Sequence, residues 1–116
     1  MIIIAVDDLM FSSKISTTAK GLGVAIQFAR TPEAVIAAVR AAGAGLVILD
    51  LNSARVRPLD VVMALKADPA LIGVRTVGFV SHVQTDLIDR ARAAGVDQVM
   101  ARSAFVTQLP QLLQQA

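Results

Sequence analysis

The chain has 116 residues, of which 55% are hydrophobic and 17% charged, and its formal net charge is +2. This composition excludes a disordered chain, and so small a charge argues against direct binding to nucleic acid or membrane. No cysteine is present, which excludes disulfides and thiolate chemistry, and no apolar run is long enough to span a bilayer. We therefore expect one cytoplasmic domain over residues 1–116.

Short aliphatic runs alternate with helical patterns along the chain. The first run ends at two adjacent acids, Asp7 and Asp8. Thr31 and Pro32 mark the start of the second helix, as cap and first helical residue. The sequence predicts strands over 2–6, 24–28, 46–50, 76–80 and 97–101, and helices over 9–22, 32–42, 59–67, 86–94 and, with Pro110 in its first turn, from about 107 to 116.

The run from Leu46 to Asp50 is the most informative part of the chain. Four consecutive large aliphatics predict a strand that is buried on both faces, as in the middle of a parallel sheet. Asp50 follows at the carboxyl end, where open α/β sheets bind their ligands. The next helical pattern begins near Leu59, too far along for Asp50 to cap it, so we interpret Asp50 as a functional residue.

The alternation of five strands with five helices predicts an α/β fold with helices on both faces of a parallel sheet. The length favours the flavodoxin-like strand order 2-1-3-4-5. In that order the first and third strands are neighbours, so Asp7, Asp8 and Asp50 are expected to converge. Ser81 and Arg102 follow the fourth and fifth strands and should reach the same edge.

These side chains suit one kind of chemistry. Clustered carboxylates repel one another, and a hard divalent cation such as Mg²⁺ relieves that repulsion. One carboxylate can then attack phosphorus and form an aspartyl phosphate. Ser81 offers a hydroxyl and Arg102 a positive charge to the phosphoryl oxygens. The alternative interpretation is that Asp7 and Asp8 only cap the first helix.

At this point the chain resembles a response-regulator receiver domain of two-component signal transduction, similar to chemotaxis regulators. The resemblance spans essentially the whole chain. It rests on Val6-Asp7-Asp8, on residues 46–50, on Val80-Ser81, on residues 94–97 and on Met100-Ala101-Arg102. It implies a protein that receives a phosphoryl group in a phosphorelay and at most removes it slowly, rather than an enzyme.

The resemblance also implies a role for each site residue. Asp50 matches the phosphoacceptor, and Ser81 matches the hydroxyl that the phosphoryl group recruits. Mg²⁺ would be bound by Asp8, Asp50 and the backbone carbonyl of Asn52, and by Asp7 through water.

Several positions depart from the family's pattern, among them the loop over residues 53–58, which lacks the family's Met-Pro and its later Gly. Arg102 replaces a lysine that contacts the phosphoryl group, and Ser103 replaces the proline after it. Val99 replaces the switch aromatic, so signalling through an aromatic rotamer is not expected. His82 stands where a small residue is usual, and its alternatives are a gate over the site, a phosphoacceptor or base, or a simple loop residue.

The resemblance implies a histidine kinase or phosphotransfer protein as donor and a further protein as downstream partner. A receiver-like interaction module that does not depend on phosphorylation is the main alternative. A flavin-binding protein is disfavoured, because Asp7 and Asp8 would repel a phosphate group. Phe105 and the short last helix indicate either an apolar patch for a homodimer or partner, or ordinary packing.

Overall fold

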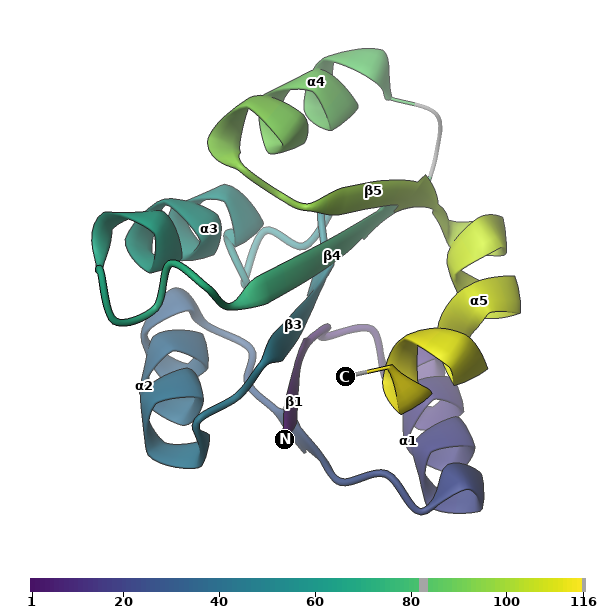
Figure 1. The fold of residues 1–116 in the computed structure, drawn as a ribbon. Coiled ribbons are helices and arrows are strands. Elements are labelled where there is room, and N and C mark those ends of the chain that lie inside the picture. The colour runs from purple at the N-terminus through teal and green to yellow at the C-terminus, as the bar shows by residue number, and fades with distance from the viewer. Residues whose placement is uncertain (82–83, 116) are drawn as a thin grey trace.

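The computed structural model describes residues 1–81 and 84–115. Within these residues five parallel strands form one sheet in the order β2-β1-β3-β4-β5, which confirms the predicted fold class and topology (Figure 1). The strands are β1 (Ile2–Ala5), β2 (Ile26–Phe28), β3 (Leu46–Asp50), β4 (Arg75–Val80) and β5 (Gln98–Ala101). The helices are α1 (Leu9–Leu22), α2 (Pro32–Ala42), α3 (Pro58–Ala67), α4 (Thr85–Ala94) and α5 (Arg102–Gln114).

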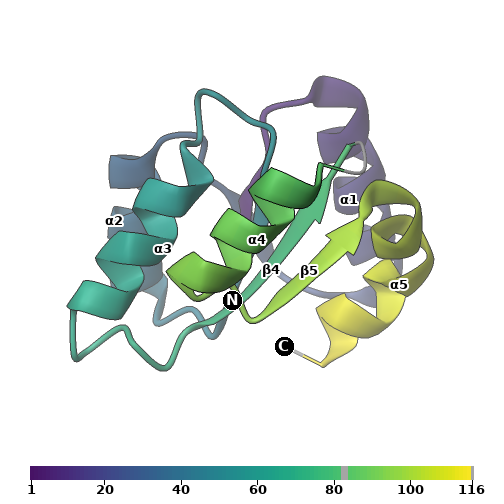
Figure 2. The same cartoon turned by 90° about the horizontal axis from the view of Figure 1, so that it is seen from above.

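The helices form a layer on each face of the sheet. Helices α1 and α5 lie on one face, and α2, α3 and α4 lie on the other (Figures 1 and 2). Successive side chains of a strand point to opposite faces. Accordingly Ile2 and Ile4 of β1 pack with α1 and α5, whereas Ile3 packs with α2 and α3. Strand β3 is buried along its whole length, as its aliphatic run predicted.

The last helix differs from the prediction. It begins at Arg102, directly after β5, so Pro110 lies inside the helix and not in its first turn. The early start buries Phe105, whose ring stacks on Phe79 with centroids 4.5 Å apart. Phe105 is 0% exposed, so ordinary packing is the correct alternative and Phe105 contributes no apolar patch. None of the helices in the described part of the chain is long and apolar enough to cross a bilayer.

Asp97, one of the residues that carried the resemblance, has a structural partner at the opposite end of the sheet from Asp50. Its carboxylate accepts hydrogen bonds from the Thr76 amide at 2.8 Å and from the Thr76 hydroxyl at 3.2 Å. The Asp97 amide donates back to the Thr76 hydroxyl oxygen at 3.0 Å. This reciprocal pair holds the beginning of β4 to the segment before β5, so Asp97 is not part of the candidate site.

Candidate functional site

The carboxyl edge of the sheet brings the predicted side chains together. Asp50 is the last residue of β3 and pairs with Phe79 of β4 in the sheet register. Asp7 and Asp8 follow the neighbouring β1, and Ser81 follows β4. The β4 and β5 arrows point to the edge at which α1 and α5 begin (Figure 2).

Asp50 is a buried carboxylate with only 7% of its surface exposed. Its Oδ1 accepts the amide of Asn52 at 2.9 Å. The other oxygen accepts no hydrogen bond from the described residues. Every fully buried side-chain oxygen or nitrogen in these residues does have a hydrogen-bond partner, so this oxygen of Asp50 is accessible to solvent. Burial raises the pKa of Asp50, while the Asn52 amide and the charge of Arg102 act in the opposite direction. Asp50 therefore combines a desolvated carboxylate with an accessible oxygen.

Asp8 is engaged on both sides of its carboxylate. Oδ1 caps α1 by accepting the amide of Phe11 at 2.9 Å, so Asp8 does cap the first helix. Oδ2 accepts a hydrogen bond from Nη2 of Arg102 at 3.1 Å. The Phe11 amide and then Arg102 hold the pKa of Asp8 below its usual range. Asp7 has a different partner, since its Oδ1 accepts a hydrogen bond from the hydroxyl of Ser53 at 3.2 Å.

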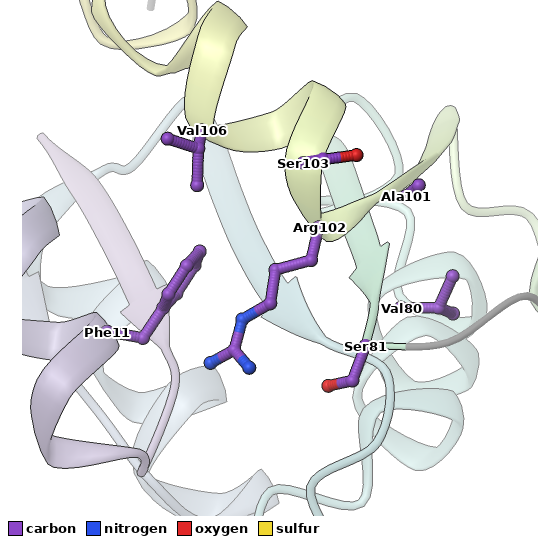
Figure 3. A pocket seen from close by; sticks show the side chains of 7 residues that line it. All are labelled: Phe11, Val80, Ser81, Ala101, Arg102, Ser103 and Val106. Atoms are coloured by element: carbon purple, nitrogen blue, oxygen red, sulfur yellow. The ribbon is translucent and has the colours of Figure 1, made fainter.

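Arg102 extends from the first turn of α5 to the region between Phe11 and Ser81 (Figure 3). Its guanidinium carbon lies 4.3 Å from the centroid of the Phe11 ring, a cation–π distance. Sequence reasoning missed the part played by Phe11, because an aromatic at the third position of a helix indicates only core. A pocket of about 500 Å³ lies here, lined by Phe11, Val80, Ser81, Ala101, Arg102, Ser103 and Val106.

The side chain of Asn52 makes two tertiary hydrogen bonds that the sequence did not indicate. Its side-chain oxygen accepts the amide of Ser81 at 2.7 Å, and its side-chain nitrogen donates to Gln84. Asn52 thereby connects the loop after β3 to the end of β4 and the start of α4. The Ser81 hydroxyl faces the pocket (Figure 3). His82, predicted as an alternative gate, lies outside the described residues.

The oxygen donors at this edge are of the chemical type that binds a hard divalent cation. Asp8, Asp50 and the backbone carbonyl of Asn52 are the donor types that Mg²⁺ prefers, with waters completing its coordination. The negative charges of Asp7 and Asp8 also raise the pKa of Asp50, which a cation would counter. Within residues 1–81 and 84–115, however, no three His, Cys, Asp or Glu side chains are grouped to hold a metal. In this structure one carboxylate oxygen of Asp8 is occupied by Arg102.

The burial of Asp50 leads to a prediction about pH. Because the pKa of Asp50 is raised above its ordinary value of 3.8, the folded state binds the proton more tightly than the unfolded state does. Protonated Asp50 therefore stabilises the folded state below pH 3.8, and this stabilisation is lost as the pH rises through the raised pKa. Asp50→Asn should therefore be more stable than the parent at pH 7, and the difference should shrink as the pH falls toward 3.8. Urea unfolding across this range, in the presence of EDTA, measures it.

The matched control for this prediction is Asp60→Asn. Asp60 is a surface acid whose side chain is 46% exposed and paired with Arg57, so its loss should change stability by only about 0.5 kcal/mol. A loss of stability in Asp50→Asn that is equal at every pH would contradict the predicted charge burial.

Comparison with known proteins supports the fold strongly. The sequence matches no family model and no curated protein. The structure is similar to the chemotaxis response regulator CheY4 of Vibrio cholerae, with a TM-score of 0.82, 15% identity, and coverage of 98% of this chain and 95% of that one. It is also similar to the phosphorylated cyanobacterial phytochrome response regulator RcpA (TM-score 0.78, 22% identity, coverage 98% and 88%). The Mn²⁺-bound response regulator Rcp1 gives a TM-score of 0.75 at 18% identity, with coverage of 98% and 88%. The chain has the fold of response-regulator receiver domains.

Proposed function

We propose that this chain is a receiver domain of two-component signal transduction, which accepts a phosphoryl group on Asp50 with the help of Mg²⁺. The observation that carries the proposal is the position of Asp50. It is a buried carboxylate at the end of the central strand, with one accessible oxygen and with Ser81 and Arg102 at the same edge. The similarity to a phosphorylated response regulator supports phosphorylation of this chain.

The proposed step is a phosphoryl transfer. The free oxygen of Asp50 attacks the phosphorus of a phosphohistidine on a histidine kinase or phosphotransfer protein. The new O–P bond forms while the P–N bond breaks, and the imidazole leaves with the electron pair and takes up a proton. Ser81 donates its hydroxyl, and Arg102 its positive charge, to the phosphoryl oxygens.

Mg²⁺ would be held by Asp8, Asp50 and the carbonyl of Asn52, with Asp7 acting through water, and it would offset the negative charge of the carboxylates and the phosphoryl group. The similarity to a Mn²⁺-bound response regulator supports the binding of a divalent cation. Asn52 links the metal-binding loop to Ser81 and Gln84, so a change at Asp50 has a direct route to α4. The signal would then pass to a downstream protein that binds the altered surface.

The alternative is a receiver-like interaction module that works without phosphorylation. The pairing of Asp8 with Arg102 favours it, because the pair supplies a cation to the acidic cluster without any metal. Such a module would bind its partner in the same way whether or not a phosphodonor is present.

Incubation with acetyl phosphate and Mg²⁺, followed by intact mass spectrometry, tests the proposal. We expect one added phosphoryl group in the parent, with acetate as the leaving group, and none in Asp50→Asn. Asp60→Asn is the matched control, because Asp60 lies on α3 and pairs with Arg57, and it should be modified like the parent. An unmodified parent, or a modified Asp50→Asn, would reject Asp50 as the acceptor.

A further inference from the structure

We propose, on the basis of the function proposed above, that Arg102 sets the affinity of this site for divalent cations by competing with them for Asp8. Arg102 would act as a built-in counter-ion that the cation must displace. The inference concerns this chain's own side chains and can be tested by metal binding alone, without any phosphoryl transfer.

The first support is that both carboxylate oxygens of Asp8 already accept a hydrogen bond. Oδ1 accepts the Phe11 amide at 2.9 Å, and Oδ2 accepts Arg102 Nη2 at 3.1 Å. Release of Oδ1 would uncap α1, whose first amides need a partner. Oδ2 is therefore the oxygen that a cation would take, and Arg102 already holds it.

The second support is that Arg102 is held from two directions. The carboxylate of Asp8 lies at one side of its guanidinium, and the ring of Phe11 lies 4.3 Å from its central carbon. Phe11 is itself fixed, since it is 7% exposed and its ring packs 4.8 Å from Phe79 and 5.6 Å from Phe105. An exposed ion pair by itself is weak. The ring beneath the guanidinium lowers the freedom of Arg102 and strengthens its hold on Asp8.

The third support is that a pocket beside the pair could accommodate the displaced guanidinium. Arg102, Ser81 and Ser103 line the pocket of about 500 Å³ beside the pair. Figure 3 shows the Arg102 side chain passing between Phe11 and Ser81. Binding of a cation at Asp8 would thus free Arg102 to turn toward the side of Ser81, where the phosphoryl oxygens on Asp50 are expected. Binding of the metal at Asp8 and movement of the Arg102 charge toward the phosphoryl group would then be coupled.

Titration with Mn²⁺, followed by the electron paramagnetic resonance signal of the free ion, measures the competition. Arg102→Gln removes the competing charge and should lower the dissociation constant for Mn²⁺ about tenfold. Phe11→Leu keeps the charge and removes the ring beneath it, and should lower the constant about threefold. Competition by Mg²⁺ should displace the Mn²⁺ from each variant.

The matched control is Arg57→Gln, which removes the same charge from the loop after β3. Arg57 pairs with Asp60 and not with Asp8, so its loss should change the dissociation constant by less than about twofold. A constant for Arg102→Gln within twofold of the parent, or an equal change in Arg57→Gln, would overturn the competition. An unchanged constant in Phe11→Leu would overturn the contribution of the ring.

Failure of this inference is distinguishable from failure of the proposed function. Tighter Mn²⁺ binding in Arg102→Gln, together with no adduct on Asp50 of the parent, would support the competition and reject phosphoryl transfer. An adduct on Asp50 of the parent, together with an unchanged Mn²⁺ affinity in Arg102→Gln, would support phosphoryl transfer and reject the competition.

Discussion

Phe79→Ala should lower the free energy of unfolding by about 3–5 kcal/mol, the largest loss that we expect from a single substitution in this chain. Phe79 is 0% exposed and lies on β4, in the middle of the cluster that α1 and α5 cover. Its ring centroid is 4.5 Å from that of Phe105 and 4.8 Å from that of Phe11. The substitution leaves a cavity beneath both helices and removes both aromatic contacts.

Urea unfolding followed by circular dichroism measures the effect, and an unchanged dependence on urea concentration confirms that only stability has changed. Phe28→Ala is the matched control. Phe28 lies on the edge strand β2 and is only partly buried, so the same truncation should cost about 1 kcal/mol. Phe79→Leu, which fills more of the space, should cost about 1.5 kcal/mol and provides a value if Phe79→Ala does not fold. A cost below that of Phe28→Ala would contradict the assigned role of the aromatic cluster.

Gly78→Ala should lower the free energy of unfolding by about 1–3 kcal/mol, although the residue adds only one methyl group. A Cβ at Gly78 would lie 2.9 Å from three carbons of the Leu51 side chain. Gly78 is paired with Leu49 on one side and Val99 on the other, so its strand cannot move aside. Leu51 is 4% exposed and directly follows Asp50, and its displacement would therefore also disturb the loop that carries Asn52.

Two further variants separate this clash from a general effect of replacing glycine. Gly21→Ala lies in α1, where a new Cβ would meet nothing within 4 Å, and it should stabilise the chain by about 0.5–1 kcal/mol. In a Leu51→Ala background Gly78→Ala should cost almost nothing, because the clashing atoms are absent. Equal costs of Gly78→Ala in both backgrounds would show that Leu51 is not the cause.

The chain's local patterns were sufficient for the fold and for the position of Asp50. The aliphatic run of β3 predicted a doubly buried strand, and its bounds are confirmed at Leu46 and Asp50. Thr31 and Pro32 predicted the start of α2, and the Thr31 side chain does cap it. These signals are short-ranged, since periodicity and capping depend on residues within one or two turns. The alternation of strands with helices then restricts the topology to few choices.

The start of the last helix was decided by tertiary packing. The sequence predicted a helix from about Thr107, with Pro110 in the first turn, where its missing N–H does no harm. The helix begins five residues earlier, at Arg102, because Phe105 is then buried against Phe79 of β4 and Phe11 of α1. That burial outweighs the hydrogen bond that Pro110 cannot donate inside the helix.

The sequence by itself therefore determined the α/β class, the strand order and the position of Asp50 at the carboxyl edge. Only the tertiary structure decided which partner each polar side chain of that edge has. Arg102 reaches Asp8 across 94 residues of chain, and Asn52 reaches Ser81 across 29. No local pattern encodes such pairs, because they depend on how adjacent strands place the starts of different helices and loops against one another. Capping of α1 by Asp8 was foreseeable from the sequence, because Phe11 lies only three residues away, whereas the pairing of Asp8 with Arg102 was decided by the tertiary structure.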